Sequence, residues 1–390
     1  MKEVTPLVVM KTFKLRIYPN QAQRLQITKN FGDCRFIWNE LLAMQIKRYD
    51  NGGKYINAFG MNYLLKPLKQ QYPWLKEADS TSLTAVSQQL HGAFQKFFKK
   101  NAGFPRFKAR RYARMAYESK AVNGNIVVID SHHIKIPKLG AVYYRGGQIP
   151  QGKIKLVTVK CTPVGHYYVA VTTEMDIKPL ETIGAIVGLD LGLTNSVITS
   201  DGTKYPTVHF DKKLAEKKHY WEKRLARRRL LAEKAIAWDK HLKVENPREL
   251  GDFKNYVKAK QMVAKYSEKV ANQRHDYLHK ISKAIIIDYD VIKLESLRTK
   301  NMMRNHKLAR AIANQAWRML RTMIEYKATW YGKQVIIVSP YKTSQICSEC
   351  GYDDGYHGLG VRDWVCPQCH YHHDRDINAA INICQAKSLV

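Results

Sequence analysis

The chain has 390 residues, and 65 lysines and arginines against 33 aspartates and glutamates give it a formal net charge of +32. That length allows two or three domains with substantial cores. The charge far exceeds the magnitude of about 2–8 suggested for solubility of a small domain. It therefore indicates a polyanionic partner such as nucleic acid, rather than a merely soluble basic surface.

Several classes of protein are disfavoured. No apolar run approaches the ~20 residues that cross a bilayer, and no basic helix carries an apolar face wide enough for a membrane surface. The start, MKEVTPLVVMKTFKLR, lacks the leader of a secretory signal, and Met10 is an alternative start. Three cysteines, Cys34, Cys161 and Cys384, are scattered singly, which favours a reducing compartment over a disulfide framework. We expect a cytoplasmic protein with no membrane partner.

The N-terminal part begins with an alternating strand over residues 10–19, MKTFKLRIYP. Asn20 suits the N-cap of a helix, which we expect to end in a turn at Gly32 before a second helix. Two helices around a glycine resemble a helix-turn-helix, but that pattern alone is weak evidence for DNA reading. Packing helices that carry some phosphate contacts are the favoured interpretation.

Two more helices are expected, over residues 62–71 and 82–100, the second capped by Ser80 or Ser82. The segment FPRFKARRYAR, residues 104–114, then interleaves basic and aromatic side chains. This pattern is typical of chains that follow a nucleic-acid backbone and stack on bases. The alternative is a loop that its phenylalanines anchor to a core, and the two interpretations are compatible.

From residue 125 to 174 the hydrophobic period is two, and glycine and proline turns separate short strands. The sequence predicts a small β-domain here, which the opening strand can join. The N-terminal helices would then be an insertion between strands of one barrel. The segment DIKPLETIG, with Pro179, reads as a linker.

The remainder predicts an α/β domain. Residues 186–193, IVGLDLGL, form an apolar strand with Asp190 in mid-strand, and two more strands complete a meander. A long basic helical region over 212–283, broken near Asn246-Pro247, precedes a strand ending on Glu295. A helix stopped by Gly332, a fifth strand and a closing helix follow. This is the element order of an RNase H-like domain.

Three acids in that order indicate phosphodiester hydrolysis. Asp190, Glu295 and Asp376 lie on the first strand, the fourth strand and the closing helix, which are neighbours in that fold. Clustered carboxylates suit Mg²⁺, and two such ions about 3.5–4 Å apart activate the nucleophile and stabilise the leaving oxygen. An aspartate between two leucines is costly to bury unless it is paired or metal-bound. Glu295 alone could face solvent, and in the DRD segment Asp374 is assigned the cap.

Four cysteines predict a structural zinc site. Cys347, Cys350, Cys366 and Cys369 are spaced C-x₂-C, fifteen residues, C-x₂-C, which lets four thiolates converge on Zn²⁺ and leaves no open position. A disulfide pair or idle thiols are the disfavoured alternative. The histidines at 370, 372 and 373 could substitute as ligands, which is the weaker assignment.

Nucleic-acid contacts are assigned to basic residues on the expected helices and the basic segment. Lysines and arginines of the first long basic helix form one stripe with few acidic partners at helical spacing. The candidates are Arg16, Arg35, Arg106, Lys108, Lys213, Lys217, Arg224, Arg228, Arg274 and Lys280. A solvated charged face is the usual alternative for such a run.

These motifs together resemble the TnpB family, insertion-sequence-encoded RNA-guided DNA endonucleases related to type V CRISPR effectors. The resemblance rests on KTFKLRIYPNQAQ, FGDCRFIWN, FPRFKARR, VGLDLGLTN, NQRHDYLHKIS, IKLESL, KTSQICSECG, VCPQC and DRDINAAINI, and covers nearly the whole chain. Two departures are Cys369-His370, where the family often has Cys-Gly, and a short segment after the final helix. Neither removes a catalytic group.

The resemblance implies a wedge β-barrel over 1–20 and 121–178, interrupted by a helical recognition insertion over 21–120. It implies a RuvC nuclease domain over 179–343 and 372–390, interrupted by a zinc-binding element over 344–371. Asp190, Glu295 and Asp376 become the RuvC acids. The implied partners are a guide RNA from the transposon end, target double-stranded DNA beside a short motif, and an associated transposase, in a prokaryotic cytoplasm or nucleoid.

Two rival functions use the same features. A protein-only junction resolvase or transposase could share the fold, and a guided or zinc-dependent DNA-binding regulator would need no catalysis. The intact acid trio favours a nuclease.

Overall fold

A computed structural model describes residues 6–111, 113–297, 299–358 and 360–387, and the chain forms two compact units. One unit is Val8–Asp176, and the other is Met1–Leu7 with Ile177–Val390. Residues 1–5 of the expected first barrel segment, and 388–390 beyond the closing helix, lie outside the described part. Within that part, none of the helices is both long and apolar enough to cross a membrane.

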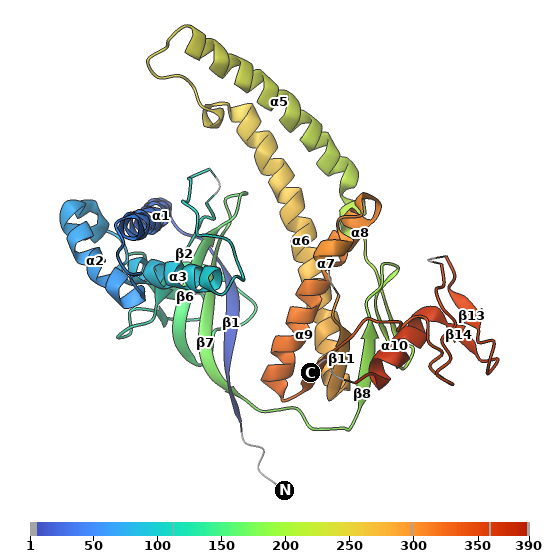
Figure 1. The fold of residues 1–390 in the computed structure, drawn as a ribbon. Coiled ribbons are helices and arrows are strands. Elements are labelled where there is room, and N and C mark those ends of the chain that lie inside the picture. The colour runs from blue at the N-terminus through green and yellow to red at the C-terminus, as the bar shows by residue number, and fades with distance from the viewer. Residues whose placement is uncertain (1–5, 112, 298, 359, 388–390) are drawn as a thin grey trace. The chain divides into compact units, whose positions relative to one another are not determined.

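A seven-stranded antiparallel sheet dominates the first unit, in the order β2-β6-β7-β1-β5-β4-β3 (Figure 1). The opening strand β1 lies inside this sheet, where it pairs with β5, so the prediction that it joins the later strands is confirmed. The strands are β1 Leu7–Ile17, β2 Ala116–Lys120, β3 Val127–Val128, β4 His133–Ile136, β5 Gly140–Arg145, β6 Lys153–Cys161 and β7 Tyr167–Ile177.

Three helices pack in the same unit: α1 Gln21–Asp50, α2 Ala58–Gln71 and α3 Ser80–Phe98, with a 3₁₀ turn at Pro73–Lys76. The predicted turn at Gly32 is wrong, because α1 runs through it unbroken. A glycine inside a helix costs only about 1 kcal/mol against alanine, and buried Phe31 and Ile37 continue the apolar face on both sides.

The predicted helix caps are half correct. Asn20 caps α1 in a capping box with Gln23. The cap of α3 is Asp79, whose Oδ1 accepts from the backbone N of Thr81, and not Ser80 or Ser82. A carboxylate is a stronger acceptor at a helix N-terminus than a hydroxyl, because the helix dipole favours negative charge there.

The second unit contains a five-stranded sheet in the order β10-β9-β8-β11-β12. Its strands are β8 Ile186–Asp190, β9 Asn195–Thr199, β10 Lys204–Pro206, β11 Val291–Glu295 and β12 Gln334–Val338. The first three form the expected antiparallel meander, and β8, β11 and β12 are parallel. Asp190 ends β8 instead of lying in mid-strand, because the chain turns at Gly192 into the antiparallel β9.

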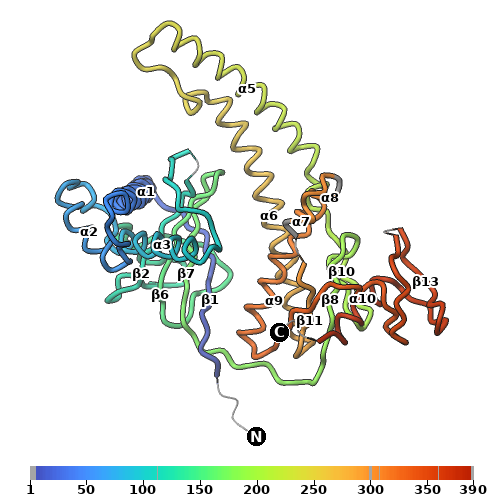
Figure 2. The backbone as a smooth tube through the Cα atoms, in the orientation of Figure 1, coloured from blue at the N-terminus to red at the C-terminus, as the bar shows by residue number. Residues whose placement is uncertain are grey.

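A long helical hairpin connects β10 to β11, as Figures 1 and 2 show. It consists of α4 Phe210–Lys213, α5 Ala215–His241 and α6 Lys254–Asp288, with a 3₁₀ turn at Leu250–Asp252. The expected break near Asn246-Pro247 is confirmed. The tip is held by Asp239, whose carboxylate accepts from Arg248 Nε at 2.7 Å and Nη2 at 2.6 Å.

The remaining elements that the structure describes in this unit are four helices and a two-stranded ribbon. They are α7 Thr299–Met302, α8 His306–Gln315, α9 Trp317–Tyr331, the two-stranded ribbon of β13 Asp363–Val365 and β14 His372–Asp374, and α10 Arg375–Gln385. Gly332 ends α9 in the left-handed conformation, φ 70°, as predicted. Helices α7 and α8 were not predicted.

Candidate active site

Asp190 and Glu295 lie side by side at one edge of the five-stranded sheet. Strands β8 and β11 are parallel neighbours with Leu189 opposite Leu294, so the residue that follows each leucine ends its strand at the same edge. Glu295 is 9% exposed. Its carboxylate accepts a hydrogen bond from Thr343 Oγ1 at 2.5 Å, and burial raises its pKa although that bond opposes the shift.

Helix α10 reaches the same edge because Gly188 lets it pack directly on β8. A Cβ at position 188 would stand 2.1 Å from the Ala380 carbonyl oxygen and 2.4 Å from the Cys384 amide nitrogen. Gly188 and Asp190 face the same side of the strand, because strand side chains alternate. Asp376 lies one helical turn before Ala380, which directs it toward Asp190.

The electrostatics of Asp190 reflect the other two acids. Burial, followed by the charges of Glu295 and Asp376, raises the pKa of Asp190 to about 7. Two or three carboxylates without a compensating cation cannot all ionise cheaply. Sequence order alone predicted this trio, and the structure places its members at the same edge of the sheet.

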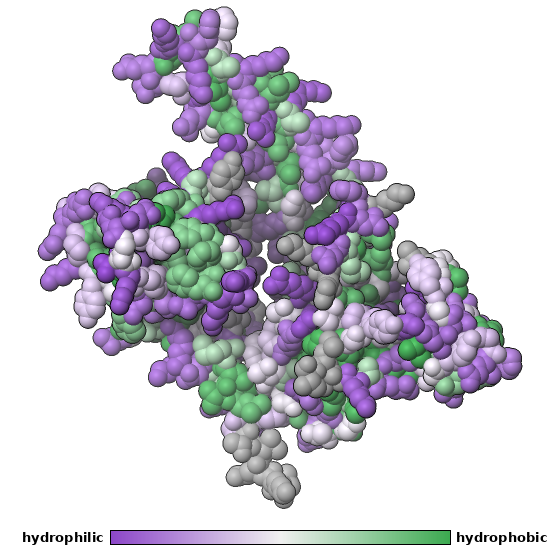
Figure 3. Space-filling model, viewed as in Figure 1, coloured by the Kyte–Doolittle hydropathy of each residue, from purple (hydrophilic) through white to green (hydrophobic). Residues whose placement is uncertain are grey.

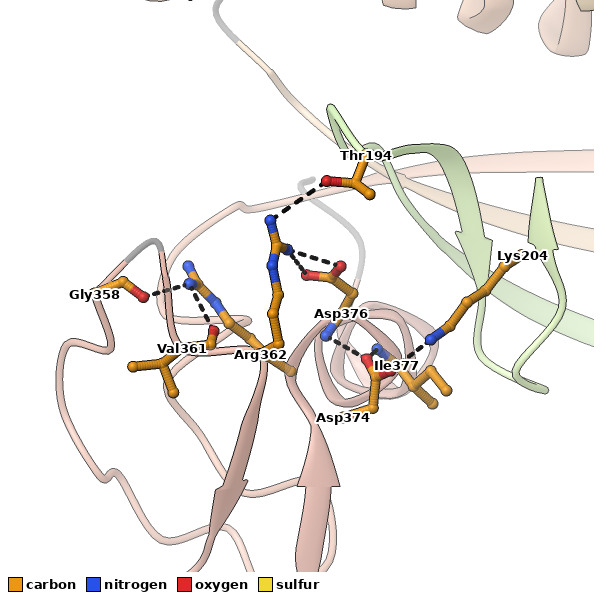
Figure 4. Close-up of polar contacts among 9 residues, drawn as sticks. Thr194, Lys204, Gly358, Val361, Arg362, Asp374, Asp376 and Ile377 are labelled. Carbon is orange, nitrogen blue, oxygen red and sulfur yellow. Dashed lines mark hydrogen bonds and ion pairs between the residues drawn. The ribbon is translucent and has the colours of Figure 1, made fainter. Parts of the chain in front are cut away.

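The acids are nevertheless not drawn into a single tight cluster. In the described residues, only the cysteine set has three or more metal-ligand side chains with all ligand atoms within 4.8 Å of one another. Asp376 instead pairs with Arg362, whose Nη1 lies 3.1 Å from Oδ2 (Figure 4). The same guanidinium reaches Thr194 Oγ1 at 3.5 Å.

Arg362 is the residue of this site that the sequence prediction missed. It lies in the insert between the cysteine pairs, directly before β13, whereas the acids come from β8, β11 and α10. The signal available was only its proximity to the cysteine-rich ribbon that leads into α10. Asp374 is confirmed as the cap of α10, since its Oδ1 accepts from the backbone N of Asp376 at 3.0 Å and of Ile377 at 3.1 Å.

The four predicted cysteines form one cluster. The Sγ atoms of Cys347 and Cys369 are 3.7 Å apart, and those of Cys350 and Cys366 are 3.6 Å apart. A tetrahedral Zn²⁺ with Zn–S bonds of about 2.3 Å holds its sulfurs about 3.8 Å apart. The cluster therefore fits a tetrahedral metal, and no disulfide joins these cysteines.

The histidines are not equivalent to the cysteines. His373 is buried, and its Nε2 lies 3.0 Å from the Cys347 sulfur, while its ring stacks on Trp364 with centroids 4.6 Å apart. It thus lies in contact with a cysteine ligand candidate, outside the four-sulfur set. His370 adopts φ 58°, a turn conformation, and His372 is exposed.

The cysteine cluster is fastened to α10 by two asparagines one turn apart. Asn378 donates from Nδ2 to the Ile346 carbonyl at 2.8 Å and accepts from the Ser348 amide at 2.8 Å. Asn382 donates to the carbonyls of Thr343 and Ile346 at 2.8 and 2.7 Å. Since Thr343 also donates to Glu295, one short segment ties the cysteine cluster to two of the three acid positions.

The predicted nucleic-acid residues of the helical hairpin differ in their availability. Lys217 and Arg224 on α5 are exposed, and Arg228 is half-buried. Lys213 ends α4 before a break at Leu214, so it is outside the predicted helical stripe. Arg274 is half-buried and donates to Asn314 Oδ1 at 2.8 Å, a structural contact.

The remaining predicted nucleic-acid residues also differ in their exposure and in the contacts that they make. Lys280 is exposed and pairs with Asp276 at 2.8 Å. Arg106 is exposed and Arg35 half-buried, and Arg16 lies over the Tyr18 ring at 5.3 Å. Lys108 lies 3.5 Å above the Trp38 ring, and burial lowers its pKa to about 8.

Comparisons with known proteins match most of the chain. Residues 9–54 match a family described as "Helix-turn-helix domain", residues 166–306 one described as "Probable transposase", and residues 317–383 one described as "Cas12f1-like, TNB domain". The first match covers the single unbroken helix α1. The last covers α9, the cysteine cluster and most of α10.

Two relatives match over nearly the full length. One from Streptomyces pristinaespiralis is 30% identical over 97% of this chain and 89% of its own. One from Escherichia coli K12, InsQ, is 30% identical over 97% and 92%. Both are named "Putative RNA-guided DNA endonuclease".

A solved structure shares the fold. The structure titled "Cryo-EM structure of the Cas12f1-sgRNA-target DNA complex" aligns with a TM-score of 0.52 at 14% identity, over 97% of this chain and 100% of that one.

Proposed function

Because the chain belongs to the TnpB family, we propose that it is an RNA-guided endonuclease that hydrolyses both strands of target DNA at one site, next to a short target-adjacent motif. The observation that carries the proposal is the meeting of Asp190, Glu295 and Asp376 at one sheet edge, where burial and then the charges of Glu295 and Asp376 raise the pKa of Asp190. A DNA-binding regulator has no need of such a costly arrangement.

The three acids are suited to hold Mg²⁺. Hard carboxylate oxygens are the ligands this ion prefers, and the uncompensated charge at Asp190 is what a divalent cation would relieve. Asp190, Glu295 and Asp376 would be the side chains that hold the ions. The ions would supply activation of the attacking water and stabilisation of the leaving oxygen.

Other residues of the site prepare these groups. Thr343 fixes one oxygen of Glu295 through its hydroxyl. The Asp374 cap fixes the first turn of α10, which orients Asp376. Arg362 neutralises Asp376 in the metal-free protein, and must exchange this contact when Asp376 takes a cation. Thr194 is the second point at which Arg362 is held.

The cysteine cluster is proposed as a structural zinc site. Four thiolates leave no open position for a substrate. Its task is to fix the start of α10 and the segment with Thr343, because Asn378 and Asn382 join the cluster to that helix.

We assign the domains on the same premise. The sheet order β10-β9-β8-β11-β12 supports an RNase H-like RuvC domain over 179–343 and 372–390, with the zinc element at 344–371. The seven-stranded sheet supports a wedge over 1–20 and 121–178, and α1 to α3 support a recognition insertion over 21–120, except that β2 Ala116–Lys120 belongs to the sheet and moves the boundary to before residue 116. The net charge of +32 suits guide RNA and DNA phosphates. An associated transposase is a further proposed partner.

One experiment tests the proposal. The chain is expressed with its native flanking DNA, the copurified RNA is sequenced, and plasmids matching that RNA are incubated with the complex and Mg²⁺. We expect a defined RNA and a double-strand break in matching plasmids alone. Asp190→Asn should bind the same RNA and leave the plasmid intact.

Any other result either favours a rival function or refutes part of the proposal. No bound RNA refutes guidance, and RNA-independent cleavage favours a resolvase or transposase. Binding of matching DNA without cleavage favours a regulator. Cleavage by the Asp190→Asn protein refutes the assignment of the site.

A further inference from the structure

The unit Val8–Asp176 contains a large cavity that the proposed nuclease chemistry does not use. It measures about 710 Å³ and lies between the C-terminal ends of α1 and α3. Its walls are mainly aromatic, and we call it the aromatic pocket: Tyr49, Tyr55, Phe94, Phe97, Phe98 and Phe104. Figure 3 shows hydrophobic side chains gathered over this end of α3.

The rings of the pocket are arranged as walls with open faces. Phe104 meets Phe94 and Phe97 edge-on, with centroids 5.6 and 5.3 Å apart, and Tyr55 meets Phe98 edge-on at 5.3 Å. Three rings remain accessible at the mouth, since Tyr49 is 79% exposed, Phe98 51% and Phe104 47%. Exposed aromatic faces of this kind are platforms for stacking.

The pocket is held open by its own hydrogen bonds. Gln45 is buried and donates to the Ile56 carbonyl at 2.5 Å, while its oxygen accepts from the Ile56 amide at 3.2 Å. Tyr55 Oη lies 2.8 Å from His91 Nδ1. Gly53 allows the loop to pass close to α1, because a Cβ there would stand 2.6 Å from Arg48 Cγ. The wall formed by residues 51–57 is therefore fixed in place.

Charge at the rim favours an anionic occupant. Lys54 lines the pocket, and Lys99 and Lys100 follow Phe98 directly; all three are exposed. Among the residues that the structure describes, none of these lysines has a carboxylate within 4 Å. These lysines would not attract an aliphatic protein segment, whereas they would attract the phosphates of a nucleic-acid backbone.

We propose that the aromatic pocket binds an unstacked base of single-stranded RNA, with its phosphates against the lysines of the rim. Stacking on aromatic rings beside a cationic track is the general mode of single-strand binding. RNA is favoured over DNA by Asp50, an exposed carboxylate on the same rim. It repels phosphate but can accept from a ribose 2′-hydroxyl, which DNA lacks.

The inference rests on the proposed guided function for the source of the RNA, and its test is independent of cleavage. The full chain is titrated with a labelled 12-nucleotide oligouridylate RNA and with the DNA counterpart, and uridine photocrosslinks are mapped by mass spectrometry. The test variant is the double substitution Tyr49→Ala and Phe98→Ala at exposed rings. The matched control is Tyr63→Ala, an 82% exposed aromatic of α2 outside the pocket.

We expect the double variant to bind the RNA probe at least about fivefold more weakly, because the stacking of each base on an aromatic ring contributes appreciably to the binding free energy. The control should stay within twofold of the unchanged protein. Crosslinks should fall on peptides spanning Tyr49 or Phe98 and disappear in the double variant. Asp50→Asn should weaken the RNA probe more than the DNA probe.

Three results would overturn the proposal. Equal RNA affinity of the double variant and the unchanged protein excludes base stacking in the pocket. Equal losses for RNA and DNA, with no effect of Asp50→Asn, exclude RNA selection. A concentration-dependent dimer that the double variant abolishes would assign the pocket to a second copy of the chain. If any of these results is obtained with a protein that still cuts guided targets, only the pocket assignment fails. If the protein copurifies with no RNA and shows no guided cleavage, the proposed function itself is refuted.

Discussion

Replacing Gly188 by alanine tests the link between helix packing and the acid site. The new Cβ would stand 2.1 Å from the Ala380 carbonyl oxygen, 2.4 Å from the Cys384 amide nitrogen and 2.9 Å from the Cys384 Cα. All three are backbone atoms, so no side-chain rotation relieves the clash. Helix α10 must retreat by about 0.9 Å to reach the 3.0 Å below which real Cβ contacts essentially never fall.

That displacement has two consequences of different size. Overpacking of this kind costs about 1–3 kcal/mol of unfolding free energy, which a protein of this length should survive. The same shift carries Asp376 away from Asp190 and Glu295. A misplacement of about 1 Å at a reacting centre costs on the order of 100-fold in rate, or about 2.7 kcal/mol of activation free energy.

The assay is single-turnover cleavage of a guided target, with RNA occupancy and the melting temperature measured on the same preparation. Gly92→Ala is the matched control, because a Cβ there meets nothing within 4 Å and alanine favours a helix. We expect Gly188→Ala to keep its RNA and lose about 100-fold in rate, with the control unchanged. A Gly188→Ala protein that cuts within twofold of the unchanged rate would refute the packing argument.

Three further predictions concern charge and metal at this site. Because the folded protein holds the pKa of Asp190 at about 7, above its ordinary value, metal-free stability should fall as pH rises from about 4 to 7. Asp190→Asn should therefore abolish cleavage yet raise the melting temperature at pH 8 in Mg²⁺-free buffer. The gain in unfolding free energy should be at most about 4 kcal/mol, which is the full value of the pKa shift from 3.8 to about 7; a difference that is the same at pH 4 and pH 8 contradicts this. Cys366→Ser should remove bound zinc and lower cleavage more than tenfold, measured by metal analysis and cleavage rate, while Cys384→Ser, outside the cluster, keeps both; a fully active zinc-free protein would speak against the structural role. Arg362→Ala removes a cation from the acids and should lower the melting temperature more at pH 8 than at pH 6, with Mg²⁺ restoring it; a pH-independent loss would mean that the contact is only a packing contact.

Chemical motifs were more predictable than local chain geometry. Asp190, Glu295, Asp376 and the four cysteines could be proposed from the sequence because metal sites require defined side-chain types in a defined order. The structure places the acids at one sheet edge and the cysteines in one cluster. The unbroken helix through Gly32 could not, because one helical glycine costs less than the burial of its flanks contributes.

Other features depend on contacts that no local pattern encodes. Arg362 meets Asp376 only after the ribbon folds back on the start of α10. The break between α8 and α9 occurs at Ala316, which adopts a left-handed φ of 53°. Alanine rarely takes that conformation, so no local pattern in the sequence indicates a break at this position. The aromatic pocket likewise appears only when the ends of α1 and α3 meet.

Locating divalent cations in crystals grown from the protein would test the central claim most directly, namely that three acids distant in sequence hold the catalytic metal. Crystals soaked in Mn²⁺, a heavier substitute for Mg²⁺, would be measured for anomalous scattering. The account predicts Mn²⁺ peaks contacting Asp190, Glu295 and Asp376, with Arg362 displaced from Asp376, and no such peaks in Asp190→Asn crystals. Manganese bound elsewhere, with this edge of the sheet empty and Arg362 still paired, would contradict it.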